Sequence, residues 1–256
     1  MSWVSSTARS ATSSRSRTEF RNGLRMIDNW PEIARFLRTI PALASLTDDE
    51  LDRLRPHLRY RTLEKGEHVY QQGQGTEFLY FIRQGRIKVS QTANGKNVIV
   101  GFYGPSELLG CCGLVGDTCY PCCAQAIETA MLVFVSREVF HRLLSSVPTV
   151  AATLLSQMVS RLREAHCKMK SLALEPVEER VIGVLLELGE KIGERRDGKV
   201  TLPAKVTREQ ISEMAGTTIE TTSRVIGKLR QAGLVHCVSR STTFDTELLG
   251  NIIERQ

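Results

Sequence analysis

The apolar pattern of this chain changes its period near Val147, and no other feature limits the possible fold as strongly. From about Tyr60 to Phe134, short apolar runs such as FLYFI, RIKVS, VIVGFY and MLVFV are separated by glycines. Regular short strands with glycine turns are typical of an antiparallel sandwich or roll. After Val147 the apolar residues recur every three or four positions, which is the period of a helix. The chain is therefore predicted to be α+β, with an antiparallel β-roll over residues 31–146 and a long helix over residues 147–175.

The predicted long helix carries a narrow apolar seam at alternating steps of four and three residues. Such a heptad pattern is typical of an interface between two helices, and charged side chains such as Arg161, Glu164 and Lys168 flank it. Because the seam is narrow for a broad core face, we predict that it forms a dimer, with packing inside one chain as the alternative. The seam residues are Ala151, Leu155, Met158, Leu162, Ala165, Met169 and Leu172.

Residues 207–233, TREQISEMAGTTIETTSRVIGKLRQAG, predict two short helices joined at Gly216. Thr207 and Gln210 form a capping-box pattern at the start of the first helix, and glycine allows the tight turn between the two. The inward stripe of the second helix is expected to consist of Ile219, Val225, Ile226 and Leu229. Residues 234–244, LVHCVSRSTTF, alternate enough to form a hairpin wing against the same core. The sequence therefore predicts a winged helix-turn-helix domain, which we assign to residues 176–256.

The outward face of the second helix is polar, and Thr217 or Thr218 is expected to cap its N-terminus. A helix of this kind enters the DNA major groove, where residues near its N-terminus contact base edges. The candidate DNA contacts are Thr218, Glu220, Thr221, Ser223, Arg224 and Lys228. Helix pairs with a central glycine also occur in enzymes as plain packing units, which is the alternative for these residues taken alone.

The net charge of +6 does not by itself indicate nucleic-acid binding, because much of the excess lies near the N-terminus. Residues 1–38 hold seven arginines against three acidic residues, whereas residues 200–256 hold seven basic against six acidic residues. The Ser/Arg-rich sequence within residues 1–30 predicts a disordered tail. No apolar run approaches the roughly 18 residues of a membrane span. The protein is therefore expected to be soluble and cytoplasmic, with no membrane partner.

The order of a β-roll, a long helix and a winged helix-turn-helix resembles the CRP/FNR family of bacterial transcription regulators. The motifs that carry the resemblance are KGEHVYQQG, YFIRQGRIKV, CAQAIETAMLVFVS, EERV and IETTSR, and it covers roughly residues 36–250. The resemblance implies a jelly roll like that of cyclic-nucleotide-binding proteins and a homodimer on double-stranded DNA. It also implies RNA polymerase as a partner and no enzyme activity.

The motif IETTSR is more similar to the FNR branch than to the cyclic-AMP branch, which usually has an arginine where this chain has Ile219. The resemblance implies that Glu220, Ser223 and Arg224 contact the bases of a TTGA-type half-site in an inverted repeat. The chemistry agrees, because arginine donates two hydrogen bonds to guanine, glutamate accepts one from cytosine and serine can contact thymine. The alternative for Glu220 is that it serves only as the first-turn acid of its helix.

Five of the seven cysteines fall within thirteen residues, which is hard to explain as packing. The cluster consists of Cys111, Cys112, Cys119, Cys122 and Cys123. A cytoplasmic chain has little use for structural disulfides, so metal ligation or redox chemistry is favoured. The alternatives are an iron–sulfur cluster, a soft metal or metalloid, haem, or direct thiol oxidation without a cofactor, including a disulfide between Cys119 and Cys122. Cys167 and Cys237, which stand apart, are expected to serve packing.

The family resemblance narrows the choice of signal. The cyclic-nucleotide branch places a glutamate and an Arg-Ser pair near the positions of Cys111, Cys122 and Cys123, so the counter-charge for an anionic nucleotide is missing and cyclic AMP is not expected. The oxygen-sensing FNR branch uses N-terminal cysteines for its iron–sulfur cluster, and residues 1–110 contain none. The favoured hypothesis is a DNA-binding regulator gated by a cysteine-based sensor. A thiol oxidoreductase and a signal-independent activator are the alternatives.

Overall fold

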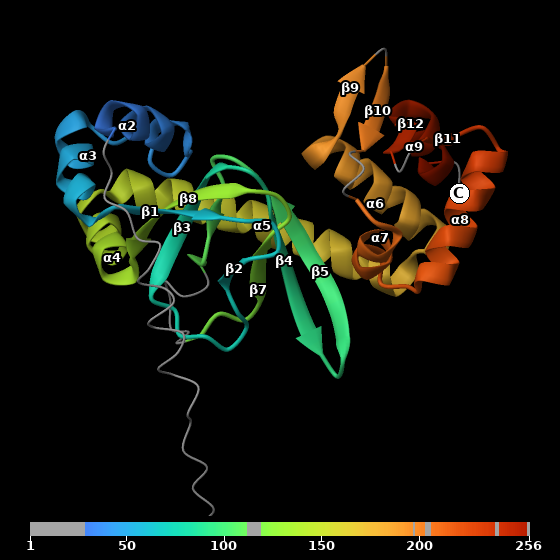
Figure 1. Ribbon diagram of the computed structural model, residues 1–256, viewed down its shortest axis with the longest axis horizontal. Helices are drawn as coiled ribbons and strands as arrows, with labels where there is room; N and C mark the ends of the chain where they lie inside the picture. Colours follow the sequence, from blue (N-terminus) through green and yellow to red (C-terminus); the bar gives the residue numbers. More distant parts are fainter. Residues whose placement is uncertain (1–28, 112–118, 197, 203–205, 239–240, 255–256) are drawn as a thin grey trace, which may run out of the picture.

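The structure, a computed structural model, describes residues 29–111, 119–196, 198–202, 206–238 and 241–254. The tail predicted over residues 1–30 lies outside this part of the chain except for its last two residues, and Trp30 already belongs to a helix. Cys112 also lies outside the described residues. The predicted α+β order is confirmed, with antiparallel sheets first, a long helix next and a helix-turn-helix unit last (Figure 1).

The β-roll consists of two antiparallel four-stranded sheets, with strand orders β1-β8-β3-β6 and β2-β7-β4-β5. Its strands are short and alternate with glycine turns, as the sequence pattern predicts. For example, Gly85 adopts a φ of 82° between β3 and β4, and a Cβ atom there would lie 2.5 Å from the carbonyl oxygen of Thr129. The strands are β1 (Arg59–Leu63), β2 (His68–Tyr70), β3 (Phe78–Gln84), β4 (Ile87–Ala93), β5 (Lys96–Tyr103), β6 (Leu108–Leu109), β7 (Cys123–Ala126) and β8 (Ala130–Ser136).

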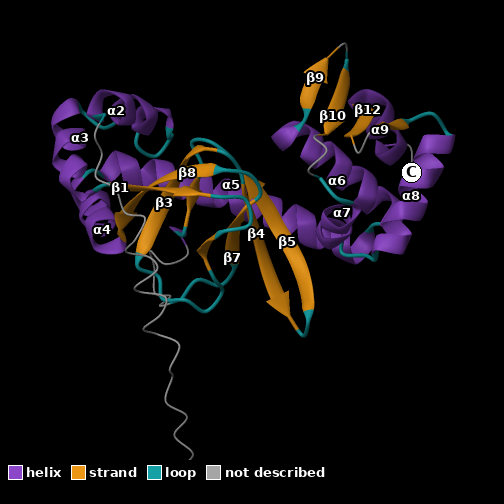
Figure 2. Ribbon diagram, viewed as in Figure 1, coloured by secondary structure: helices purple, strands orange, loops and turns teal. Residues whose placement is uncertain are grey.

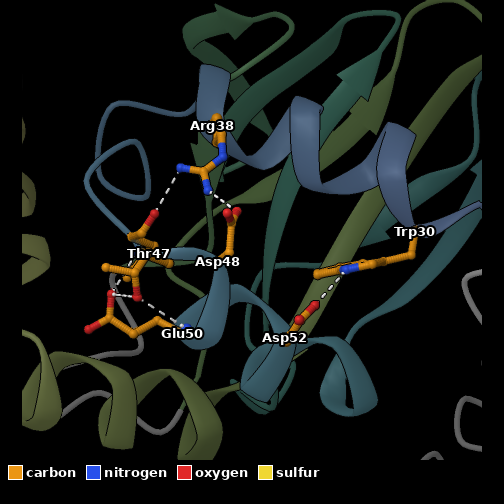
Figure 3. Close-up of polar contacts among 7 residues, drawn as sticks. Trp30, Arg38, Thr47, Asp48, Glu50 and Asp52 are labelled. Carbon is orange, nitrogen blue, oxygen red and sulfur yellow. Dashed lines mark hydrogen bonds and ion pairs between the residues drawn. The ribbon is translucent and has the colours of Figure 1, made fainter.

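Two helices, α2 (Trp30–Thr39) and α3 (Asp48–Leu54), precede the roll, and a 3₁₀ turn, η1 (Arg55–His57), leads from α3 into β1. Thr47 and Glu50 form a complete capping box at the start of α3, and the Trp30 indole nitrogen donates to Asp52 at 2.7 Å (Figure 3). These contacts hold α2 and α3 together at the end of the roll from which the long helix begins.

The roll continues into α4 (Arg137–Ser146) and α5 (Pro148–Leu174), two helices that meet at an angle of 111° (Figure 2). Pro148 suits the first position of α5, since proline lacks a donor that would be unsatisfied there. The first turns of α5 bury Val150 and Leu154 in a core that they share with α2, α3 and Phe140 of α4. Among the described residues no single helix is long and apolar enough to cross a membrane, although α4 and α5 together meet that test by length and composition alone.

The C-terminal unit follows Pro176 and consists of four helices and a third antiparallel sheet of order β11-β12-β10-β9. The hairpin predicted after the second helix of the motif is present as β11 and β12, with Val235 opposite Phe244. The elements are α6 (Val177–Ile192), β9 (Glu194–Arg196), β10 (Lys199–Leu202), α7 (Arg208–Ala215), α8 (Ile219–Gln231), β11 (Val235–Val238), β12 (Ser241–Asp245) and α9 (Thr246–Glu254).

The roll and the C-terminal unit share a hydrophobic core. Ile99 and Phe102 of β5 are buried in the same cluster as Val181 of α6 and Ile211 of α7. A polar contact lies beside this cluster, where the Asn97 amide nitrogen donates to the Glu213 carboxylate of α7 at 2.9 Å. The β4–β5 hairpin therefore contacts the first helix of the helix-turn-helix directly.

Candidate functional site

The turn between α7 and α8 has the geometry that its sequence predicts. Thr207 Oγ1 accepts a hydrogen bond from the Gln210 backbone at 3.1 Å, and the Gln210 side chain accepts one from the Thr207 backbone at 3.0 Å. Gly216 ends α7 in the left-handed region, with φ at 61°. A Cβ atom at Gly216 would lie 2.7 Å from Cδ2 of Leu172, so the end of α5 packs against this turn. The capping box of α7 and the contact with Leu172 thus hold the turn from which α8 starts.

The N-terminus of α8 is capped by Thr218, whose Oγ1 accepts a hydrogen bond from the Thr221 backbone at 3.2 Å. Glu220 lies in the first turn and is exposed. Hydrogen bonds from its own backbone N–H and from the Thr218 hydroxyl lower the pKa of the Glu220 carboxyl. Glu220 therefore carries a full negative charge at neutral pH and can act as a hydrogen-bond acceptor at the tip of the helix.

The candidate DNA contacts lie mostly on one outward face. Glu220, Ser223 and Arg224 are exposed, as is Thr218, while Thr221 is half-buried. Among the described residues no hydrogen bond or ion pair holds the Arg224 guanidinium, whereas Lys228 Nζ forms an ion pair with Glu178 of α6 at 3.1 Å. Arg224 can therefore reach a ligand without breaking a contact, and Lys228 cannot.

The inward face of α8 differs from its prediction at one position. Val225, Ile226 and Leu229 are buried as expected, but Ile219 is 44% exposed, so its assignment to the core was wrong. Ile219 is the first residue of α8, and Thr222 is the buried residue of the first turn instead. Among the described residues nothing forms a hydrogen bond with the Thr222 hydroxyl, although the side chain is fully buried.

A hollow of about 250 Å³ lies beside the exposed face of α8. Two guanidinium groups, those of Arg208 and Arg230, line it together with Ser223, Ile226 and Gly227. The sequence motif did not single out Arg208, because that residue opens α7 rather than α8. The charge and the hydroxyl of this hollow suit an anionic oxygen such as a backbone phosphate.

The structure brings three of the clustered cysteines into one neighbourhood. Burial raises the pKa of the Cys122 thiol, a hydrogen bond with Tyr70 lowers it, and the neighbouring Cys123 and Cys111 raise it further. Cys123 Sγ accepts a hydrogen bond from the Gln72 backbone at 3.3 Å. Cys122 therefore remains a neutral thiol at physiological pH.

The other described cysteines differ in exposure. Cys119 is exposed at an isolated bridge with Gly75, and Cys167 is exposed on α5. Cys237 is half-buried, as a packing role requires, but the exposure of Cys167 shows that its predicted packing role was wrong. The six described cysteines are thiols rather than disulfides, and within the described ranges no three metal-ligating side chains converge on one point.

Arg161 of α5 joins the long helix to the cysteine neighbourhood. Its Nη1 lies 3.5 Å from Cys111 Sγ, and its Nη2 donates to the Leu108 carbonyl oxygen at 3.1 Å. The guanidinium also lies over the Tyr103 ring, 5.1 Å from the centroid. Burial raises the pKa of Tyr103 to about 12, so the ring stays uncharged beneath this cation. Sequence spacing gave no sign of this contact.

The predicted seam of α5 divides into two parts. Met158 packs against the core of the roll and Ala151 is half-buried, so the N-terminal part also serves packing inside the chain. The larger seam residues on either side of Met158 face solvent, with Leu155, Leu162 and Met169 at 66%, 55% and 57% exposed. Ala165 is exposed as well, and Leu172 is 43% exposed although it touches the turn at Gly216. A helix of this length with large exposed apolar side chains is incomplete as a single chain.

Comparisons with known proteins agree with this arrangement. The cyclic nucleotide-binding domain family matches residues 60–147, and the Crp-like helix-turn-helix domain family matches residues 179–251. The transcriptional activator protein anr of Pseudomonas aeruginosa is 31% identical over 75% of this chain and 79% of its own. The cyclic AMP receptor protein of Thermus thermophilus is 29% identical over 76% of this chain and 88% of its own.

Solved structures give the same fold. The structure of FixK2 from Bradyrhizobium japonicum superposes with a TM-score of 0.65 at 24% identity, covering 75% of this chain and 95% of that one. The Pseudomonas relative is named as a transcriptional activator and not as an enzyme. A cyclic nucleotide-binding roll followed by a Crp-like helix-turn-helix, together with the similarity to anr, shows that this chain belongs to the CRP/FNR family of transcription regulators.

Proposed function

We propose that this regulator acts as a homodimer on a TTGA-type inverted repeat, and that thiols in its β-roll control the binding. The observation that carries the DNA assignment is the exposed face of α8. Glu220, Ser223 and Arg224 face solvent together on a helix whose start is capped and whose orientation is fixed by the turn at Gly216. This is the part of a recognition helix that contacts bases in the major groove.

Each of the three side chains suits a different base edge. The Arg224 guanidinium can donate two hydrogen bonds to O6 and N7 of guanine. The ionised Glu220 carboxylate can accept a hydrogen bond from N4 of cytosine, and the Ser223 hydroxyl can contact thymine. Thr218 and Thr221 flank these readers, and we expect them to contact the DNA backbone. Lys228 would join them only after leaving Glu178.

The test of base reading is the affinity of purified protein for a duplex that carries a TTGA-type inverted repeat, measured by fluorescence anisotropy. We expect Arg224→Ala to weaken binding by about 10- to 100-fold, since one bidentate contact discriminates by about 1–3 kcal/mol. Arg196→Ala, which removes an exposed cation from β9, is the matched control and should change affinity little. If the Arg224→Ala protein kept full affinity and selectivity, Arg224 would not read a base.

The homodimer rests on the exposed seam of α5. Leu155, Leu162 and Met169 would be covered by the same residues of a second chain, as in a two-stranded coiled coil. A twofold axis along α5 would place two copies of α8 for two half-sites about 34 Å apart, which matches an inverted repeat. By likeness to the named Pseudomonas activator, we expect the DNA-bound dimer to act as an activator with RNA polymerase as its partner.

The sensor assignment rests on Cys111, Cys122 and Cys123, which the roll gathers in one neighbourhood. An iron–sulfur cluster needs about four thiolate ligands and a zinc site the same number, and the described residues supply no such set. A metalloid held by three thiolates or a haem with one axial cysteine needs fewer ligands, but direct oxidation needs a single thiol and no further group. The chemistry that these thiols support best is therefore direct oxidation. Cys119 and Cys112 are not needed for it.

The test of the sensor uses protein that was purified without oxygen. We expect DNA affinity to change on addition of an oxidant and to return with a reductant, in protein free of stoichiometric metal. Elemental analysis and the absorption spectrum separate iron–sulfur, zinc and haem from bare thiols. A DNA affinity indifferent to oxidant in metal-free protein would contradict the thiol assignment, and a stoichiometric metal would replace it.

A further inference from the structure

The contact between Arg161 and Cys111 is the direct link between the cysteine neighbourhood and the long helix. We propose that Cys111 is the thiol whose oxidation by a peroxide alters DNA binding, and that Arg161 passes this change to α5. The inference rests on the proposed thiol control and names the residue that reacts and the residue that responds. Arg161 acts as a positioning residue, since its effect on DNA passes through the helix.

Three contacts hold the Arg161 side chain against the roll. The guanidinium contacts Cys111 Sγ at 3.5 Å, donates to the Leu108 carbonyl at 3.1 Å and lies 5.1 Å from the centre of the Tyr103 ring. These three groups lie on or beside β5 and β6, about 50 residues before Arg161 in the sequence. A single side chain of the helix therefore meets both the backbone and the reactive sulfur of the roll.

Cys111 is better placed than its neighbours to react. A guanidinium beside the sulfur stabilises negative charge, and the thiolate is the nucleophile in cysteine oxidation. Cys122 lacks such a cation and is held as a neutral thiol by burial. Cys123 Sγ accepts a hydrogen bond from the Gln72 backbone, and the group lies on β7 rather than against α5. The Cys111 sulfur contacts α5 directly, through Arg161.

The reaction balances with the peroxide as oxidant. The Cys111 thiolate attacks one peroxide oxygen, an S–O bond forms and the O–O bond breaks. The sulfur loses two electrons to the peroxide, whose other oxygen leaves with a proton as water or an alcohol. The product is a sulfenic acid, which loses its proton as a sulfenate or reacts with a second thiol, and a reductant restores the thiol.

The added oxygen changes what Arg161 contacts. An oxygen on Cys111 Sγ is a stronger acceptor than sulfur and competes with Leu108 and Tyr103 for the guanidinium. The side chain must move to meet it, and the backbone of α5 moves with the side chain because Arg161 is half-buried and held on three sides. Leu162, the next residue, belongs to the exposed seam, so the change reaches the predicted dimer contact.

The experiment compares full-length wild-type, Cys111→Ser, Arg161→Met and Arg161→Lys proteins, with Cys119→Ser and Arg163→Met as matched controls. Cys119 is an exposed thiol of the same sequence cluster and Arg163 an exposed cation on the same helix. We expect hydrogen peroxide to change wild-type affinity for the inverted-repeat duplex by about 5- to 150-fold, the usual range of coupling between sites. Both controls should respond like the wild type. Cys111→Ser and Arg161→Met should bind DNA without responding, and Arg161→Lys should recover part of the response.

A second measurement needs no DNA. The rate at which iodoacetamide alkylates Cys111 at neutral pH, followed by mass spectrometry, should fall about tenfold in Arg161→Met and much less in Arg161→Lys and Arg163→Met. If the reduced wild-type protein did not bind the duplex at all, the proposed function would be wrong. The alkylation rates would still test the contact between Arg161 and Cys111. An unchanged alkylation rate in Arg161→Met, or a full peroxide response in Cys111→Ser, would overturn the inference.

Discussion

The buried hydroxyl of Thr222 gives the most direct test of how the recognition helix is packed. Thr222 is fully buried on the inner face of α8, and among the described residues its Oγ1 has no hydrogen-bond partner. We expect Thr222→Val to stabilise the protein. Valine keeps the shape of threonine and replaces the hydroxyl with a methyl group, so no cavity forms.

The size of the effect follows from two contributions. An unsatisfied buried hydroxyl costs about 1–3 kcal/mol, and the substitution removes this cost. The new methyl group adds up to about 0.8 kcal/mol of hydrophobic burial, while the helix propensities of threonine and valine are similar. The free energy of unfolding should therefore rise by about 1–3 kcal/mol, with an increase in Tm of about 2–4 °C per kcal/mol for a chain of this size.

The assay is urea denaturation followed by circular dichroism, with Thr221→Val and Thr222→Ser as controls. Thr221 is the adjacent threonine, and its hydroxyl accepts a hydrogen bond from Thr218 Oγ1 at 3.1 Å. Thr221→Val should therefore lose about 0.5–1.5 kcal/mol, and Thr222→Ser should lose about 1 kcal/mol because it keeps the hydroxyl and removes the methyl. Affinity for DNA should not change in Thr222→Val, since the side chain faces inward. A Thr222→Val protein less stable than wild type would show that the hydroxyl has a partner, and the reasoning would fail.

Three further predictions follow from other contacts. Gly216→Ala should lower the free energy of unfolding by about 1–2 kcal/mol in urea denaturation, because φ is 61° there and the new methyl would meet Leu172; an unchanged midpoint would contradict this. Leu162→Glu should give a monomer in light scattering, whereas Arg163→Glu should stay a dimer; a dimeric Leu162→Glu would refute the seam. Tyr103→Phe should lose less stability than wild type as the pH rises from 10 to about 12, because tyrosine in the unfolded chain ionises first; equal losses in pH-dependent denaturation would refute the assignment.

Local signals predicted most of the helix-turn-helix. The capping box at Thr207 and the glycine turn at Gly216 depend on residues within a few positions of one another, and both are present in the structure. The exposure of Ile219 could not be predicted in this way. Helical period alone placed it on the inner face, but burial of a first-turn residue depends on how far the neighbouring helix extends.

The contacts of the clustered cysteines could not be predicted from the sequence. The clustering of cysteines in the sequence indicated which segment carries reactive side chains. It did not indicate which thiols lie close together in the folded protein. Arg161 is fifty residues from Cys111, and the pairing depends on how α5 crosses the roll. Lys228 is a second example, because its ion pair with Glu178 joins two residues that are also fifty positions apart. Such long-range contacts are set by packing, which leaves no local pattern.

The burial of Ile99 and Phe102 against α6 and α7 has a consequence for how the protein folds. Each of these side chains contributes about 1.5–3 kcal/mol of hydrophobic burial to a cluster that belongs mainly to the C-terminal unit. A C-terminal fragment that begins after α5 would lack Ile99 and Phe102. The first helix of its DNA-binding motif would then expose an apolar patch to solvent. The roll is thus also a structural part of the C-terminal unit, and the two halves are expected to unfold in one cooperative transition.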